Sequence, residues 1–174
     1  MPDIIKIKVV KRTKKVLLIV PILLLVMQSA FATMAKVEAR TTEPYFAHID
    51  ANLIQHGTQW VSKNGILHIE GDYWLGNETR SGAVFEAWIV SVRLDQTTGQ
   101  GTFRLKWLLT YPSSLSSISG TARGEIRGSQ IFGTFTSREG SNALEGVRRS
   151  GSFEGVLQSP THVVIDVTGV TVYH

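Results

Sequence analysis

The chain has 174 residues, of which 43% are hydrophobic, and no cysteine; this is enough for one domain with its own core and excludes a scaffold held together by disulfides. Its net charge of +4 comes from the amino end, because residues 1–32 hold six Lys/Arg and one acid whereas residues 33–174 hold 12 Lys/Arg and 13 Asp/Glu. Since the remainder is near neutral, the composition argues against nucleic acid as a partner, which would need basic side chains on its phosphates.

Residues 1–32 have the pattern of a signal peptide. A basic head precedes the apolar run 16–27, and Ala30-Phe31-Ala32 places small side chains where a signal peptidase cleaves. The alternative is an uncleaved membrane anchor over residues 16–35, which has the length of a bilayer-spanning helix. Both interpretations place the rest of the chain outside the cytoplasm, either secreted or tethered to the membrane, because the Lys/Arg cluster stays on the cytoplasmic side.

Residues 33–57 are predicted to form a polar tether followed by a short helix. The helix is expected between residues 45 and 56, with Thr42 as its cap and Pro44 in its first turn. Its apolar positions recur at helical spacing: Phe46, Ile49, Leu53 and Ile54.

From residue 58 to the carboxyl end the apolar positions alternate with a period of two, which predicts an all-β domain over residues 58–174. The expected strands cover residues 59–62, 66–69, 73–75, 84–94, 102–111, 118–127, 130–136, 146–157 and 162–173. Lys63-Asn64-Gly65 between the first two is a strong hairpin signal. Consecutive hairpins without helical crossovers form an antiparallel meander, and a meander of about eight strands hides its edges by closing into a barrel.

Three short turns predict how neighbouring strands pair. A loop at residues 96–99 aligns Val92 with Phe103, Trp88 with Trp107 and Glu86 with Leu109, all on one dry face. A turn at Gly128-Ser129 and a loop at residues 159–161 fix two further hairpins. The turn at Gly128-Ser129 aligns Ile126 with Ile131 and Ala122 with Phe135. The loop at residues 159–161 aligns Leu157 with Val163 and Phe153 with Val167.

Three glycine-punctuated runs, 118–124, 144–147 and 151–156, resemble the strands of allene oxide cyclase-like and dirigent-like β-barrel proteins. They also resemble small secreted proteins of that general pattern with no assigned role. The resemblance implies an eight-stranded barrel whose lumen holds a small hydrophobic molecule, and in some members steers its cyclisation or coupling. No catalytic motif of those enzymes is present, so no functional residue is transferred from them.

The predicted dry face supplies the candidate site residues. Trp88, Trp107, Phe103 and Tyr111 are expected to line the lumen and contact a ligand. Glu86 is the candidate catalytic group, because a carboxylate among apolar neighbours has a raised pKa and can act as acid or base. Its alternative is a place at the barrel rim, solvated or paired with an arginine such as Arg80.

Other polar patterns carry weaker indications. Glu70 and Asp72 have the spacing of paired carboxylates or ligands for a hard cation, but the favoured interpretation is a bulge at Gly71 with both groups in water. Asn77 begins a glycosylation sequon. The five histidines lack the spacing of a zinc site, and neither a metal nor a cofactor is predicted.

The sequence therefore favours an extracytoplasmic, non-enzymatic β-barrel that binds a small hydrophobic ligand or lipid. One alternative is an isomerase or cyclase acting on a hydrophobic small molecule, with Glu86 as acid/base. Another is a surface interaction module with a solid core. The interior volume separates them, because a ligand needs an open lumen.

Overall fold

The computed structural model describes residues 40–173, which form ten β-strands and one short 3-10 helix, η1 (Asn142–Leu144). The strands are β1 (Thr41–Gln55), β2 (Thr58–Val61), β3 (Ile66–Glu70), β4 (Tyr73–Glu78), β5 (Val84–Asp95), β6 (Gln100–Tyr111), β7 (Ser116–Arg127), β8 (Gln130–Gly140), β9 (Arg148–Ser159) and β10 (His162–Tyr173). The predicted all-β class is confirmed.

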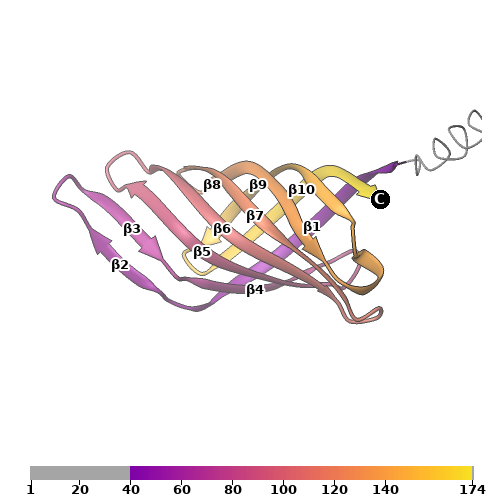
Figure 1. The fold of residues 1–174 in the computed structure, drawn as a ribbon. Helices are drawn as coiled ribbons and strands as arrows, with labels where there is room; N and C mark the ends of the chain where they lie inside the picture. Colours follow the sequence, from indigo (N-terminus) through magenta and orange to yellow (C-terminus); the bar gives the residue numbers. More distant parts are fainter. Residues whose placement is uncertain (1–39, 174) are drawn as a thin grey trace, which may run out of the picture. The chain divides into compact units, whose positions relative to one another are not determined.

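Eight antiparallel strands close into a barrel, as predicted. Neighbouring strands from β4 to β10 pair in sequence order, and β1 closes the ring by pairing with both β4 and β10. The β1–β10 ladder is continuous from Thr41 opposite Tyr173 to Asn52 opposite His162. Figure 1 shows the strands wrapped around a common axis.

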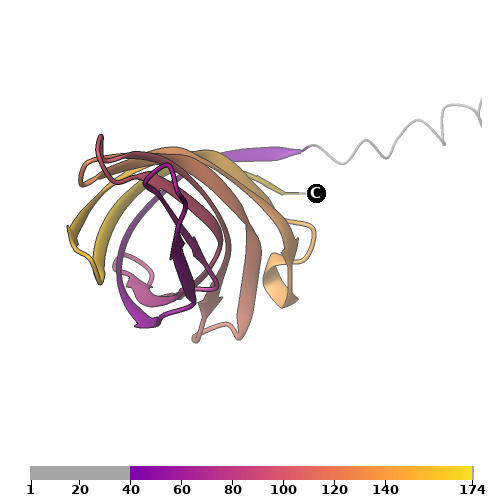
Figure 2. The same ribbon diagram turned by 90° about the vertical axis from the view of Figure 1, so that its left-hand side faces the viewer.

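The remaining two strands, β2 and β3, form a hairpin that continues β1 and β4 beyond the barrel. Its turn contains Gly65 at φ +76°, as the Asn-Gly signal predicts. β3 also pairs with the last residues of β5, so the hairpin remains part of the same sheet. Figure 2 looks along the barrel from the end where this hairpin lies.

The predictions for the amino end lie outside the described residues. This holds for the signal peptide at 1–32, the alternative anchor at 16–35 and the first part of the tether. Among residues 40–173, no helix is long and apolar enough to span a bilayer.

The predicted helix over residues 45–56 is wrong, because all but the last of these residues belong to strand β1, which ends at Gln55. Ala47, Ile49 and Ala51 are 4%, 5% and 0% exposed. Phe46, which comes directly before Ala47, is 54% exposed. This is the alternation of a strand with one face on the core. The apolar residues that suggested a helical stripe therefore point to both sides of the sheet, and the barrel begins at residue 41 rather than 58.

A β-bulge at Val90 corrects the predicted pairing of β5 with β6. Asp95 opposite Gln100 and Val92 opposite Phe103 are as expected, but Ile89 lies opposite Leu105 and Ser91 opposite Arg104, leaving Val90 as an extra residue. Before the bulge every side chain of β5 is on the face opposite to the predicted one. The other two predicted hairpin registers, around Gly128-Ser129 and residues 159–161, are confirmed.

Inward-facing side chains of the eight strands form the core, and one glycine makes room for the largest of them. Trp107 lies opposite Gly120 on the neighbouring strand. A Cβ at Gly120 would lie 2.6 Å from the indole carbon Cζ2 and 2.0 Å from the Thr136 carbonyl oxygen. The indole therefore requires glycine at this position in β7.

Candidate functional site

The barrel encloses an apolar cavity. Its volume is about 70 Å³, several times the volume that one water molecule needs. It is smaller than typical drug-sized pockets, so the lumen is neither filled nor wide. The cavity is lined by Tyr45, Ile49, Phe85, Phe103, Leu105, Trp107, Leu109, Ala122, Ile131, Phe135, Phe153, Ile165 and Val167.

Two of the four predicted lining residues contact this cavity. Phe103 and Trp107 are 7% and 6% exposed and belong to its wall. Trp88 is wrong as a lining residue, because the bulge at Val90 turns it to the outer face, where it is 39% exposed and lies opposite Lys106. Tyr111 faces inward but does not line the cavity.

Aromatic rings form much of the cavity wall. Trp107 meets Phe135 edge-on with ring centroids 6.1 Å apart, and Phe135 meets Tyr45 in the same way at 6.2 Å. The Trp107 indole Nε1 is buried and has no acceptor among the described residues. The wall thus carries one free hydrogen-bond donor in an otherwise apolar surface.

Beyond Tyr45 the apolar wall gives way to a cation that sequence reasoning missed. Arg149 on β9 holds its guanidinium carbon 4.4 Å from the centroid of the Tyr45 ring and 5.6 Å from that of Tyr111. Its Nη1 donates a hydrogen bond of 2.6 Å to the Tyr111 hydroxyl. The inward phase of β9 was the available signal, because Arg149 lies four residues before Phe153, which the predicted hairpin register already placed inside.

Tyr45 joins the apolar cavity to this cation. Burial raises the pKa of its phenol well above the usual range, Tyr111 raises it further, and the Arg149 charge opposes the shift only in part. The phenol is therefore neutral at any physiological pH. It can donate a hydrogen bond but cannot neutralise the arginine.

Glu86, the predicted acid/base, does not face the lumen. It lies between the inward residues Phe85 and Ala87, which are 7% and 3% exposed, so its side chain is on the outer face of β5. There it accepts a 2.7 Å hydrogen bond from the Tyr73 hydroxyl, which raises the pKa of Tyr73. The predicted alternative, a pairing with Arg80, is also not formed. The carboxylate instead belongs to an outer cluster in which the Tyr73 ring packs on Trp88 at 5.4 Å.

Asp72 corrects the expectation that both carboxylates around Gly71 are in water. Glu70 is exposed, but Asp72 is 4% exposed and accepts a 2.7 Å hydrogen bond from the backbone N–H of Gly57. Gly71 takes φ +82°, the turn geometry that the sequence suggested. Asp72 thus anchors the junction between β1 and β2. No group of three or more acidic or histidine side chains within residues 40–173 is arranged to hold a metal ion.

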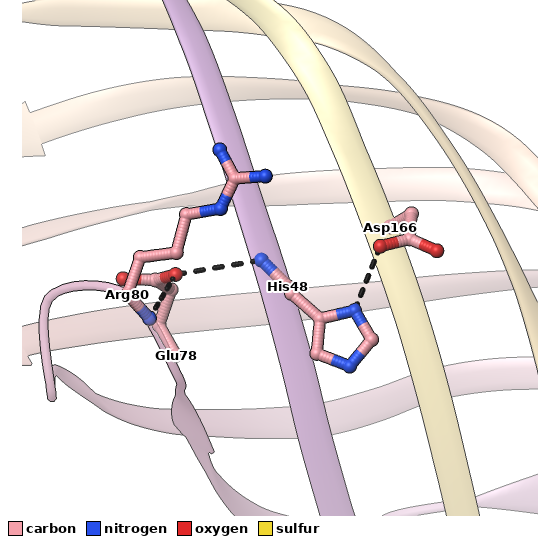
Figure 3. Close-up of polar contacts among 4 residues, drawn as sticks. All are labelled: His48, Glu78, Arg80 and Asp166. Carbon is pink, nitrogen blue, oxygen red and sulfur yellow. Dashed lines mark hydrogen bonds and ion pairs between the residues drawn. The ribbon is translucent and has the colours of Figure 1, made fainter.

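Glu78 at the end of β4 is a second residue that the sequence analysis missed as structurally important. It is 3% exposed. Its carboxylate accepts from the backbone N–H groups of Arg80 and Ser81 at 2.9 and 2.7 Å, from the Ser81 hydroxyl and, more weakly, from the His48 N–H at 3.4 Å. Figure 3 shows the contacts of Glu78 with Arg80 and His48, which join the β4–β5 turn to β1.

The outer face of the closing seam carries two histidine–aspartate pairs. His48 Nδ1 lies 2.7 Å from Asp166, directly across the β1–β10 ladder, and His162 Nε2 lies 2.9 Å from Asp50. Both pairs are partly exposed to solvent, which limits their contribution to stability. Asn77 is also exposed, on the outer face of β4, so glycosylation there stays a prediction.

Comparison of the chain with protein-family models, with curated proteins and with solved structures finds no match. The resemblance to allene oxide cyclase-like and dirigent-like barrels stays a prediction. Inferences about function rest on the cavity and its surroundings.

Proposed function

We propose that the chain is an extracytoplasmic, non-enzymatic barrel that binds a small, slender hydrophobic ligand or lipid chain in its lumen. The observation that carries this proposal is the apolar cavity of about 70 Å³ inside a closed barrel. A well-packed interior has few voids larger than a water molecule, so a cavity of this size lined by apolar side chains suits a hydrophobic guest. The signal-peptide pattern of residues 1–32 supports the proposed extracytoplasmic location.

The outward position of Glu86 leaves the cyclase alternative without its expected acid/base in the lumen. The interaction-module alternative has one observation in its favour: Leu75, Trp88 and Val90 on the outer face of β4 and β5 are 37%, 39% and 47% exposed. Exposed apolar groups of this kind occur at protein-interaction sites. This second candidate becomes the better one if no apolar probe enters the cavity.

Calorimetric titration with 1-octanol, a slender uncharged chain, tests the proposal. We expect 1:1 binding by the full chain and its loss in Ala122→Leu, because Ala122 lines the cavity and a larger side chain there occupies the limited space. The matched control is Ala143→Leu, which adds the same atoms to an exposed residue of η1. Absence of octanol binding by the unaltered chain, or equal binding by Ala122→Leu, would contradict a ligand in the lumen.

A further inference from the structure

Arg149 is an inward-facing cation in the wall of the barrel. On β9 it shares a face with Phe153, which is 8% exposed, and it lies opposite Thr171 of β10, which is 3% exposed. Its side chain is therefore withdrawn from bulk water for much of its length. Removing a guanidinium from water is costly unless an anion or several acceptors replace the water.

The protein supplies only part of that replacement. A guanidinium has five N–H donors. Within the described part of the chain Nη1 donates to Tyr111, while Nε is buried and has no acceptor. None of the ion pairs formed between residues 40 and 173 includes Arg149. The two tyrosine rings stabilise the charge through their faces but leave Nε without an acceptor.

Nearby acidic residues do not neutralise it. Glu78 is committed to the β4–β5 turn, where its oxygens accept from Arg80, Ser81 and His48. Glu43 lies two strands away in register, on the far side of Thr171, is exposed and accepts a hydrogen bond from the Tyr173 hydroxyl at 3.2 Å. Neither forms an ion pair with Arg149.

The cation and the cavity adjoin each other through one side chain. Tyr45 lines the cavity, and the Arg149 guanidinium lies against its ring. Arg149 is not itself a lining residue, so a ligand with its hydrocarbon chain in the cavity must extend past the Tyr45 ring for an anionic group at its end to reach the guanidinium. We propose that the lumen binds an amphipathic carboxylic acid, with its hydrocarbon chain in the cavity and its carboxylate on the Arg149 guanidinium.

Carboxylate fits this position better than an uncharged polar group. The planar N–H edge of arginine matches the two oxygens of a carboxylate, and such charge-assisted hydrogen bonds are stronger than neutral ones. This inference rests on the proposed binding of a ligand in the lumen and names the class of that ligand.

The test compares octanoate with 1-octanol, which has the same chain length and no charge at neutral pH. For the full unaltered chain we expect octanoate to bind roughly 10- to 100-fold more tightly, since a hydrogen-bonded ion pair replaces a neutral contact. In Arg149→Gln this preference should disappear while the affinity for 1-octanol stays the same. Arg148→Gln is the control, because the neighbouring arginine is exposed on the outer face and should leave the preference intact.

Circular dichroism first establishes that each variant is folded. If Arg149→Gln is not, Arg149→Lys retains the charge but loses the planar fork, and should weaken octanoate binding several-fold with octanol binding unchanged. Equal affinities of the unaltered chain for octanoate and octanol would overturn the carboxylate anchor and leave binding in the lumen standing. A preference that survives in Arg149→Gln, or is lost equally in Arg148→Gln, would also overturn it. Failure of both probes to bind would instead reject the proposed function.

Discussion

At the scale of single residues, the most tightly held charged group is Glu78. Burial by itself raises the pKa of this carboxyl group, but hydrogen bonds from the Ser81 hydroxyl and from the backbone N–H groups of Arg80, Ser81 and His48 outweigh it and lower the pKa below its ordinary value of 4.5. The ionised form is thus favoured by folding. Its stabilising effect is present above the pKa of the unfolded chain and is lost as the pH falls through the lower, folded pKa.

Glu78→Gln should therefore destabilise the barrel in a pH-dependent way. At pH 7 we expect a loss of about 1–3 kcal/mol in the free energy of unfolding, because the amide replaces one of the two carboxylate oxygens, each of which accepts partly buried hydrogen bonds, with an NH2 donor. The difference from the unaltered chain should shrink as the pH falls below 4.5, where the unfolded chain takes up the proton, and should be smallest once the pH is below the lower pKa of folded Glu78. Urea unfolding at pH 7 and pH 3.5 measures both values. Glu139→Gln, at an exposed position of β8, removes the same charge and should have little effect at either pH.

Part of the candidate site could be predicted from the sequence. Phe103 and Trp107 were placed in the lumen correctly because both follow the bulge-free register of β6. Arg149 was missed, since its importance depends on Tyr45 and Tyr111 from strands far away in the sequence. Asp72 was wrongly placed in water, because its burial depends on the approach of Gly57, whose backbone N–H donates to its carboxylate. Neither contact is visible in a local pattern.

At the scale of the elements, short turns predicted the register of two hairpins correctly, whereas a bulge made the predicted register of a third wrong. Hairpins with short turns fix their own register, as the β7–β8 and β9–β10 pairs show. The bulge at Val90 has no comparable local signal, and it reverses the faces of Glu86 and Trp88. β1 was mistaken for a helix because its longer ladder is with β10 at the other end of the chain, while its nearer partner, β4, pairs only with residues 49–55 and is separated from it by the β2–β3 hairpin.

The bulge at Val90 can be tested by comparing a change in the length of β5 with a change in the side chain at residue 90. Deleting Val90 removes the extra residue and makes the existing pairs Ile89–Leu105 and Ser91–Arg104 consecutive, so Phe85 and Ala87 keep facing the lumen. We expect a cooperative urea transition with a loss of less than about 3 kcal/mol, whereas deleting Leu108 from the bulge-free β6–β7 ladder reverses the faces of the residues beyond it and should cost more than about 4 kcal/mol. Val90→Thr keeps the residue count at a side chain that is 47% exposed and should change stability by less than about 1 kcal/mol. An equal loss of stability on deleting Val90 and on deleting Leu108 would contradict the bulge.

At the scale of the whole molecule, stability depends on joining the two ends of the chain. β1 and β10 pair along their length, so the barrel closes through contacts between residues more than 100 positions apart. Local hairpins form without this seam, but the cavity has no complete wall until the seam is in place, because Tyr45 and Ile49 come from β1 and Ile165 and Val167 from β10. Ordering such distant segments carries a large loop-closure entropy.

A disulfide across the seam should recover more of that entropy than one within a hairpin. Phe46 and Thr168 lie directly opposite each other on β1 and β10, and Ser152 lies opposite the same Thr168 on β9, 16 positions away in sequence. The chain has no cysteine of its own, so F46C/T168C and S152C/T168C form defined crosslinks. The loop-entropy relation gives about 4.7 kcal/mol for a loop of 100 residues and about 3 kcal/mol for one of 15. Comparing the urea midpoints of the oxidised and reduced form of each variant cancels the effect of the substitutions. We expect both crosslinks to form and the seam crosslink to raise the midpoint further, whereas failure of F46C/T168C to oxidise would show that the two ends do not meet.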